Sequence, residues 1–449
     1  MILILYKKDL QKLCFYIKNN FLKSFFKKNL HYSKFFCTFA PEFKTYGFMD
    51  YSEVEQLYII SDRKIREVDT SFHRYLYDQI NWNNRIIGIK GNGGVGKTTL
   101  VLQHIKEAFP DRSKVLYVRL DNMWFKTHDL MDLVEYHYTH GGTHVFLDEV
   151  HHLRGWAGYI KGMYDDYNDL YVVYTGSSML EISQRETDLG RRQRVYTLNG
   201  MSFREFLNFE RYNVGKPITL EQLLTNHVQI ASDLCKGKKI LPLFDAYLQH
   251  GCYPFYREEG DSFFERLHGV ALHVIENDLP QVEDISYTTI EKIKRMLMIL
   301  AERVPLMPKM AELYRELETN RENGNKMLAL LAKAGLLALY SHEIINLNSL
   351  NKPDKIYLNN PNLMYCLSTH IDKGTLRETF FYDQMRNISE VLLPKKGDFM
   401  INREYLFEVG GKGKTFDQIK DEPKSYLAIG DIETGHFNRI PLWMFGLLY

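Results

Sequence analysis

Short apolar runs alternate with segments of helical periodicity between residues 85 and 200. Strands are expected at 85–91, 114–120, 143–149, 170–178 and 194–200, and helices at 98–109, 128–138 and 155–167. Nearly continuous apolar strands that alternate with helices are typical of a parallel sheet whose two faces are covered. The pattern therefore predicts an α/β domain in this part of the chain.

The periodicity is mostly helical after residue 201. A helical and aromatic extension is expected at 202–285. Three tandem helices are expected next, at 288–304, 309–318 and 325–341, and the last of them runs into an apolar, strand-like end. This order and size favour a winged-helix-like region over 286–345. A plain helical bundle that packs between domains is the alternative.

Another change of pattern follows Pro353. A helix is expected at 374–387, and two strands are expected at 397–401 and 405–411 around a short turn. These elements predict a small α/β domain over 354–449. The predicted fold class is α/β: a parallel sheet with helices on both faces over 49–201, then a helical and winged-helix-like region, and then this small domain.

Length and composition limit the class of protein. The chain has 449 residues, and single hydrophobic cores stop growing near about 250–300 residues, so two or three domains are expected. Hydrophobic residues at 45% and charged residues at 25% exclude collagen-like, coiled-coil and wholly disordered chains. No apolar stretch reaches the roughly 18–20 residues of a membrane-spanning helix. The five cysteines include no Cys-x-x-Cys pair, so we expect neither a disulfide framework nor a zinc site. We expect a cytoplasmic protein with no membrane partner.

The first fifty residues differ in composition from the rest. They contain nine Lys, no Arg and three acidic residues, a net charge of +6, which against +1 for the whole chain leaves −5 for the remainder. We expect that translation begins at Met49 and that residues 1–48 are a non-native or unstructured extension. A basic amphipathic helix that targets the protein or lies on a membrane surface is the alternative. The slightly acidic remainder argues against a protein that coats nucleic acid without sequence preference.

A glycine-rich loop lies between the first expected strand and the first expected helix. Residues 91–98 read GNGGVGKT and match the phosphate-binding pattern G-x-x-x-x-G-K-[ST] at every fixed position. Glycines let successive backbone N–H groups turn toward a phosphate at a helix N-terminus, which favours anions. We expect Lys97 to bridge β- and γ-phosphates and Thr98 to bind Mg²⁺ through its hydroxyl. The predicted nucleotide-binding residues are Gly91, Asn92, Gly93, Gly94, Val95, Gly96, Lys97, Thr98 and Thr99.

Two acidic residues end the apolar strand at 143–149. Asp148 is expected to hold Mg²⁺ through water, and Glu149 to orient or deprotonate the attacking water. A carboxylate directly after the metal-holding Asp is typical of P-loop proteins that hydrolyse ATP, so ATP and Mg²⁺ are the predicted cofactors. The histidines that follow, His151 and His152, lack the spacing of metal ligands and are expected to support neighbouring groups or to lie at the surface.

Ser177 follows the next expected strand. A strand that lies between the two strands carrying the loop and the acids would bring a polar residue at its tip to the γ-phosphate or to the attacking water. Thr175 and Ser178 are alternatives to Ser177. A simple turn into the next helix explains the same residues.

These segments together resemble a known family. The loop GNGGVGKTT, the strand VFLDEVHHL, the turn TGSSMLEIS and the segment DLGRRQRVYTLNGMSFREFL are similar to those of bacterial and archaeal AAA+-type ATPases with a C-terminal, nuclease-like domain of unknown function. The resemblance covers most of residues 50–449 and is more specific in the ATPase half. It implies that Arg191, or else Arg192, acts near the γ-phosphate, where a guanidinium offsets phosphoryl charge. Gly200 and Met201 stand where the family often has Pro.

The C-terminal segment resembles the restriction-endonuclease-like core. In that core an Asp and a Glu on adjacent strands hold Mg²⁺, and a Lys two positions after the Glu assists the water. Asp398 and Glu408 match the two acids and predict a second metal site, with Glu378 on the preceding helix. Position 410 is Gly rather than Lys. The nearest lysines are Lys412 and Lys414. A domain that serves binding or assembly is therefore the alternative to an active nuclease.

The motifs predict an ATPase whose nucleotide state positions the C-terminal module on DNA or on a protein partner. A homo-oligomer would follow if Arg191 acted on the nucleotide of a neighbouring copy. Two alternatives remain: an ATP-dependent switch or scaffold that hydrolyses slowly and binds proteins, and an ATP-regulated DNA nuclease.

Overall fold

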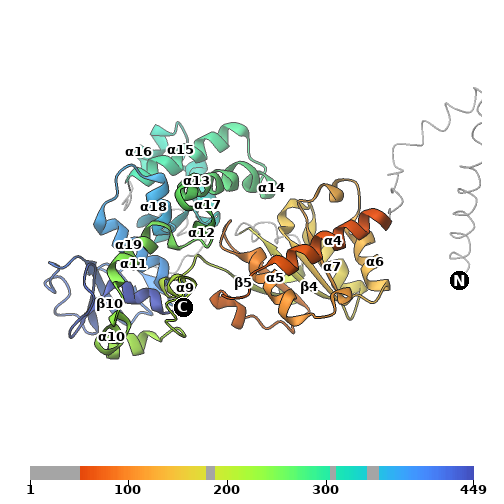
Figure 1. The fold of residues 1–449 in the computed structure, drawn as a ribbon. Coiled ribbons are helices and arrows are strands. Elements are labelled where there is room, and N and C mark those ends of the chain that lie inside the picture. Colours follow the sequence, from red (N-terminus) through yellow and green to blue (C-terminus); the bar gives the residue numbers. More distant parts are fainter. Residues whose placement is uncertain (1–50, 178–187, 304–309, 341–352) are drawn as a thin grey trace, which may run out of the picture. The chain divides into compact units, whose positions relative to one another are not determined.

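Five parallel strands form the first sheet of the protein. The computed structural model describes residues 51–177, 188–303, 310–340 and 353–449 (Figure 1). The strands lie in the order β2-β3-β4-β1-β5, and every neighbouring pair is parallel. Their bounds are Ile86–Lys90 (β1), Val115–Arg119 (β2), His144–Asp148 (β3), Tyr171–Gly176 (β4) and Arg194–Thr197 (β5). The sheet confirms the predicted fold class, and β4 lies between β1 and β3 as expected.

Helices alternate with these strands. The helices are α4 (Tyr51–Glu67), α5 (Lys97–Ala108), α6 (Leu130–Thr139) and α7 (Trp156–Asp166). α4 packs against α5 and β2, and α6 packs against α7 (Figure 1). Because neighbouring strands run in the same direction, the carboxyl ends of β1, β3 and β4 meet at one end of the sheet. The predicted boundary at Met49 lies outside the described residues.

The expected helical region follows β5. Its first helix begins with a reciprocal cap: Glu205 N–H donates to the Ser202 hydroxyl, and the Glu205 carboxylate accepts from Ser202 N–H. The helices are α9 (Phe203–Phe209), α10 (Leu220–Cys235), α11 (Ile240–Ala246), α12 (Tyr256–Glu259), α13 (Phe263–His273) and α14 (Leu279–Val282). Two π-helical turns interrupt them: η7 (Tyr247–Gly251) after α11 and η9 (Val274–Asp278) between α13 and α14.

Three further helices precede a small antiparallel sheet. They are α15 (Tyr287–Arg303), α16 (Met310–Glu316) and α17 (Arg321–Lys333). α17 ends before Gly335, whose φ of +69° turns the chain into β6 (Leu337–Tyr340). β6 pairs with β7 (Lys355–Leu358), so this sheet crosses the expected domain boundary at 345–354. A winged-helix identity for this region stays a prediction.

A second five-stranded sheet lies in the C-terminal segment. Its strand order is β12-β11-β10-β9-β8; β8, β9 and β10 are antiparallel, and β10, β11 and β12 are parallel. Its strands are β8 (Val391–Leu392), β9 (Phe399–Ile401), β10 (Tyr405–Gly410), β11 (Ser425–Ile429) and β12 (Arg439–Pro441). Helices α18 (Pro361–Leu367) and α19 (Lys373–Met385) precede the sheet, and α19 packs against β10. This sheet matches the expected small α/β arrangement.

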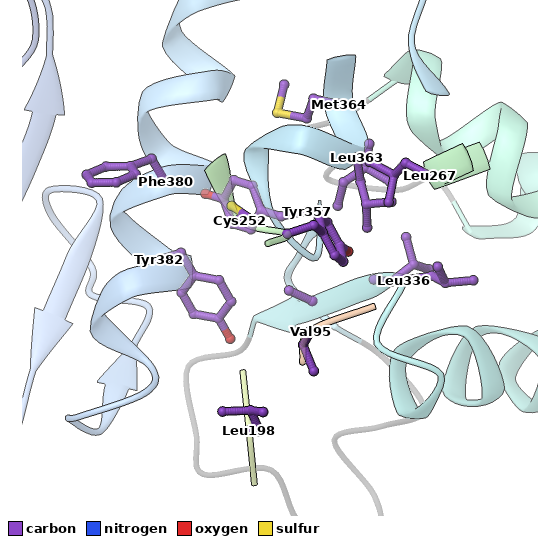
Figure 2. Packing of buried hydrophobic residues seen from close by; sticks show 14 of the residues in the cluster. Val95, Leu198, Cys252, Leu267, Leu336, Tyr357, Leu363, Met364, Phe380 and Tyr382 are labelled. Atoms are coloured by element: carbon purple, nitrogen blue, oxygen red, sulfur yellow. The ribbon is translucent and has the colours of Figure 1, made fainter. Parts of the chain in front are cut away.

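One hydrophobic cluster connects these parts. Val95 of the glycine-rich loop and Leu198 after β5 belong to the same buried cluster as Leu336, Tyr357 and Phe380 of the later helices and strands (Figure 2). Burial of this shared apolar surface is the main term that holds the later elements against the glycine-rich loop. In the part of the chain that the structure describes, no helix is both long and apolar enough to cross a membrane.

Candidate functional site

The glycine-rich loop joins β1 to α5 and wraps around Lys97. Gly94 and Gly96 have φ angles of +78° and +98°, a region that residues with a Cβ rarely adopt. Lys97 begins α5 and is only 4% exposed, and its Nζ donates hydrogen bonds of 3.0 Å to the carbonyls of Gly91 and Asn92. The loop therefore holds one buried ammonium group at the N-terminus of a helix, where an anion is favoured.

Two cavities meet at this loop. The first, which we call the acid cavity, has a volume of about 550 Å³ and is lined by Glu149, Ser177 and Asp278 among others. The second, the aromatic cavity, has a volume of about 620 Å³, and its lining includes Phe72, Phe209 and Phe255. Lys97, Glu149 and Arg266 line both cavities. The predicted loop lysine and the predicted water-activating acid thus face the same space.

Asp148 ends β3 and lies beside the loop. Its carboxylate accepts hydrogen bonds from Thr98 Oγ1 at 2.9 and 3.1 Å and from the Tyr117 hydroxyl at 2.9 Å, and it also accepts one from Thr175 Oγ1. Burial and the Asp148 charge raise the pKa of Tyr117 far above its ordinary value, so this hydroxyl stays protonated as a donor. Thr98 and Asp148, which are 50 residues apart, are together the groups that could hold Mg²⁺.

Glu149 adopts a left-handed backbone conformation with φ +57° and ψ +52°. Its N–H donates to Thr175 Oγ1 at 3.0 Å, which fixes the turn after β3 against β4. Its carboxylate lies 3.9 Å from Lys97 Nζ and 3.3 Å from His151 Nδ1. The turn therefore directs the Glu149 side chain away from the sheet and into the space in front of the loop.

The end of β4 supplies two polar residues with different positions. Thr175 is buried and bonded to Asp148 and to the Glu149 backbone, so its hydroxyl serves the turn. Ser177 lines the acid cavity, and its N–H donates to His151 Nδ1 at 3.4 Å. Of the two described candidates at this tip, Ser177 lines the acid cavity and Thr175 does not; Ser178 lies outside the described residues.

Arg74 is a site residue that no sequence motif indicated. Its guanidinium donates to the loop carbonyl of Val95, to Asn199 O at 2.7 Å, and to Glu205 at 2.9 and 3.2 Å. Burial lowers the pKa of Arg74, but the charge and hydrogen bond of Glu205 outweigh burial and raise it above the ordinary value. Arg74 thus ties the glycine-rich loop to the start of α9. Only the fold brings these groups together, since Arg74 and Glu205 are 131 residues apart.

Arg266 of α13 also escaped sequence reasoning. It lines both cavities, its guanidinium lies 4.7 Å from the centre of the Phe255 ring, and it forms an ion pair with Glu259. A guanidinium in this position can attract and partly neutralise a phosphate group bound in front of Lys97. The signal is three-dimensional, because an Arg in a helical segment carries no motif of its own.

Arg191 is not brought to the loop. It ends the short turn η6 (Asp188–Arg191), is exposed, and belongs to the lining of neither the acid cavity nor the aromatic cavity. Arg192 lies 3.5 Å from Asp165 and over the Tyr164 ring. Neither arginine therefore contacts the glycine-rich loop of its own chain among the contacts of the described residues.

The predicted C-terminal acids lie in a cluster that already contains cations. Glu408 on β10 is 1% exposed and forms an ion pair with Lys414, and Gln418 donates its amide N–H to Glu408 at 2.7 Å in the orientation that satisfies this amide. Lys355 Nζ lies 3.0 Å from Glu378. Lys414 thus reaches Glu408 although position 410 is Gly.

Asp398 differs from Glu408 and Glu378 in that it forms no ion pair with any residue the structure describes. Its carboxylate accepts a 2.8 Å hydrogen bond from Val409 N–H. Burial, and after it the charge of Glu378, raise the pKa of Asp398 to about 6. Within residues 51–177, 188–303, 310–340 and 353–449, no group of three or more His, Cys, Asp or Glu side chains is arranged to hold a metal ion.

Comparisons with known families divide the chain. The family described as "AAA domain" matches residues 83–207, which contain the glycine-rich loop, Asp148 and Glu149. This segment is similar to the AAA domain family. A second family, described as "Domain of unknown function (DUF8612)", matches residues 241–373. The ATPase half of the expected resemblance is thereby confirmed, whereas no comparison supports a nuclease-like domain after the AAA domain. A search of curated proteins gave no match.

Solved structures that match this chain include three with TM-scores near 0.25. C. elegans PCH-2 is 17% identical over 45% of this chain and 58% of its own, with a TM-score of 0.25. The S. cerevisiae Hsp104–ADP complex is 18% identical over 62% of this chain and 42% of its own, with a TM-score of 0.24. AMPPCP-bound DnaA from Aquifex aeolicus is 13% identical over 62% of this chain and 88% of its own, with a TM-score of 0.25. The chain thus spans less than two thirds of PCH-2 and Hsp104.

Proposed function

We propose that the AAA domain binds ATP with Mg²⁺ and hydrolyses it, and that its nucleotide state positions the C-terminal part of the chain on DNA or on a protein partner. One observation carries the proposal: Lys97, Thr98, Asp148 and Glu149 come from two distant segments and meet beside the acid and aromatic cavities. Each of the four supplies a group that phosphoryl transfer to water needs.

The residues divide the chemistry among them. Lys97 exchanges its loop carbonyl partners for phosphate oxygens and offsets their charge. Thr98 and Asp148 would hold Mg²⁺, which when bound neutralises charge on the β- and γ-phosphates. Glu149 accepts a proton from water while the water oxygen bonds to the γ-phosphorus and ADP leaves. Glu149 directly after Asp148 is the feature that favours ATP over GTP.

Arg191 supports an oligomeric form of this ATPase. It is exposed and lines neither cavity of its own chain, so a role near the γ-phosphate requires the nucleotide of a neighbouring copy. A size measurement in the presence and absence of nucleotide tests this proposal. A single monomeric species under both conditions would contradict it.

The C-terminal acids support binding or assembly rather than DNA cleavage. Lys414 supplies beside Glu408 the cation that the nuclease core requires, but Lys355 is paired with Glu378, and no group of three acids, histidines or cysteines among the described residues is arranged to hold a metal ion. An ATP-regulated nuclease is therefore the second candidate. Mn²⁺-dependent nicking of plasmid DNA that disappears in Asp398→Ala would favour the nuclease.

Two substitutions test the ATPase proposal directly. Lys97→Ala should abolish nucleotide binding, whereas Glu149→Gln should retain binding and lose turnover, because the lysine contributes phosphate charge and the glutamate acts only on the water. Fluorescent-nucleotide titration and steady-state phosphate release measure the two properties. Exposed residues with the same chemical changes, Lys126→Ala and Glu55→Gln, are the controls and should behave as the wild type. Equal loss of binding in both site variants would contradict the role of Glu149.

The same assay separates the partners. Several-fold stimulation of ATP hydrolysis by DNA would support a DNA-associated module. Tight retention of ATP with little turnover, with and without DNA, would instead support a slow switch or scaffold that acts on proteins.

A further inference from the structure

His151 lies between two carboxylates that come from different parts of the fold. Its Nδ1 is 3.3 Å from Glu149 Oε2, and its Nε2 is 3.7 Å from Asp278 Oδ1. His151 belongs to the short turn η4 (Val150–His152) after β3, whereas Asp278 ends the π-helical turn η9 of the helical region. The three side chains therefore form a continuous chain of contacts from the helical region to the water-activating acid.

Asp278 is a buried carboxylate with an open oxygen. In the described part of the chain its Oδ1 is among the buried side-chain atoms without a hydrogen-bond partner, and two imidazole nitrogens face it, Nε2 of His151 at 3.7 Å and Nε2 of His273 at 3.6 Å. Burial raises the pKa of Asp278, but His151, His273 and Ser177 outweigh burial and lower it. Asp278 is thus an anion that faces the imidazole of His151.

The chemistry of imidazole makes this arrangement directional. Nδ1 accepts a 3.4 Å hydrogen bond from Ser177 N–H, which is the role it has in a neutral ring whose Nε2–H faces Asp278; only a ring protonated at both nitrogens donates from Nδ1 to Glu149 and from Nε2 to Asp278. An anion behind the ring fixes its orientation, as carboxylates do for histidines in other sites. The ring orientation in turn fixes where the Glu149 carboxylate lies in front of Lys97.

The surrounding structure keeps Asp278 close to His151. Helix α14, which begins directly after Asp278, packs against η4. Asp278, His151, Ser177 and Glu149 all line the acid cavity. A movement of the helical region would therefore shift Asp278 relative to the His151 ring. Its effect on Glu149 would pass through that ring.

We propose that Asp278 and His151 are positioning residues for hydrolysis: Asp278 orients His151, and His151 holds the Glu149 carboxylate in its working position. This inference rests on the proposed ATPase function. It assigns the helical region a direct influence on turnover that does not pass through nucleotide binding. The competing explanation is a purely structural one, in which the contacts only attach η9 to the sheet.

The first test separates turnover from binding. Asp278→Asn keeps the shape of the side chain and removes its charge, so kcat for ATP should fall about 10- to 100-fold while KM and nucleotide affinity stay within about twofold. Asp284→Asn makes the same change at an exposed position six residues later and should leave kcat unchanged. A loss of affinity equal to the loss of kcat in Asp278→Asn would overturn the positioning role and favour the structural one.

The second test asks through which group Asp278 acts. In His151→Asn the amide can still donate to Glu149 from the place of Nδ1 but has nothing at the place of Nε2, so adding Asp278→Asn should reduce kcat no further. In a Glu149→Gln chain, Asp278→Asn should likewise have no effect on the residual turnover. Independent, multiplicative losses in either double variant would overturn the chain of contacts.

Failure of the underlying function gives a different result. If the wild type does not hydrolyse ATP, or if Lys97→Ala and Glu149→Gln hydrolyse it at the wild-type rate, the ATPase proposal itself fails. If those two variants behave as expected and Asp278→Asn equals Asp284→Asn, only the positioning role is wrong.

Discussion

The ion pair between Arg74 and Glu205 should be one of the largest single contributions to stability. Both side chains are almost completely buried, at 5% and 1% exposure, and Nε lies 2.9 Å from Oε1. Arg74→Met keeps much of the side-chain volume and removes the cation. Glu205 then keeps only the N–H donors of Tyr75 at 2.6 Å and Ser202 at 3.1 Å. It remains a buried anion that has lost its ion-pair partner.

The expected cost follows from this environment. Removing one partner of a buried ion pair costs about 3–5 kcal/mol, because the remaining charge cannot return to water. The carbonyls of Val95 and Asn199 also lose their donor. The double variant with Arg74→Met and Glu205→Met should recover part of the lost stability, since neither of the two buried charges remains. It still loses about 1 kcal/mol because the Glu205 side chain also caps α9.

Urea denaturation of the full chain, followed by far-UV circular dichroism, measures the free energy of unfolding. Arg66→Met is the matched control, because Arg66 and Asp62 form a 3.0 Å pair on an exposed face of α4 with side-chain exposures of 70% and 40%. That variant should lose no more than about 0.5 kcal/mol. A loss in Arg74→Met as small as that in Arg66→Met would refute the reasoning, and so would a double variant that is less stable than Arg74→Met alone.

Two further predictions concern a loop glycine and a buried acid. Gly94→Ala should abolish nucleotide binding in a titration, because its Cβ would lie 2.5 Å from the Phe255 ring at a φ of +78°; Gly155→Ala, at φ +75° with open space around the new Cβ, should cost only about 1 kcal/mol and leave binding intact. The pKa of Asp398 is raised to about 6, so the folded state holds a proton that the unfolded state releases near pH 4, and stability falls as pH rises through this window. Above pH 7, Asp398→Asn should therefore have a free energy of unfolding about 1–3 kcal/mol higher than that of the wild type, measured by urea denaturation. The difference should vanish near pH 4. A constant difference at all pH values would contradict the role of Glu378 and burial.

Local pattern predicted the parallel sheet and the glycine-rich loop of residues 85–200. The alternation of apolar strands and helices follows from burial on both faces of a parallel sheet, and the loop at 91–98 needs glycines for its backbone conformation, so both are written in consecutive residues. Asp148 and Glu149 were predicted for the same reason, since the carboxyl end of a buried strand is a local feature.

Tertiary structure alone decided which distant side chains lie beside the predicted site residues. Arg74, Arg266 and Asp278 carry no motif, because an ion pair or a cavity wall needs residues close in space and not close in sequence. The same reason explains the C-terminal acids: spacing indicated Asp398 and Glu408, but only folding brought Lys414 onto Glu408 across the gap left by Gly410. Charge pairing depends on distances of a few ångströms between folded segments, and no local pattern encodes those distances.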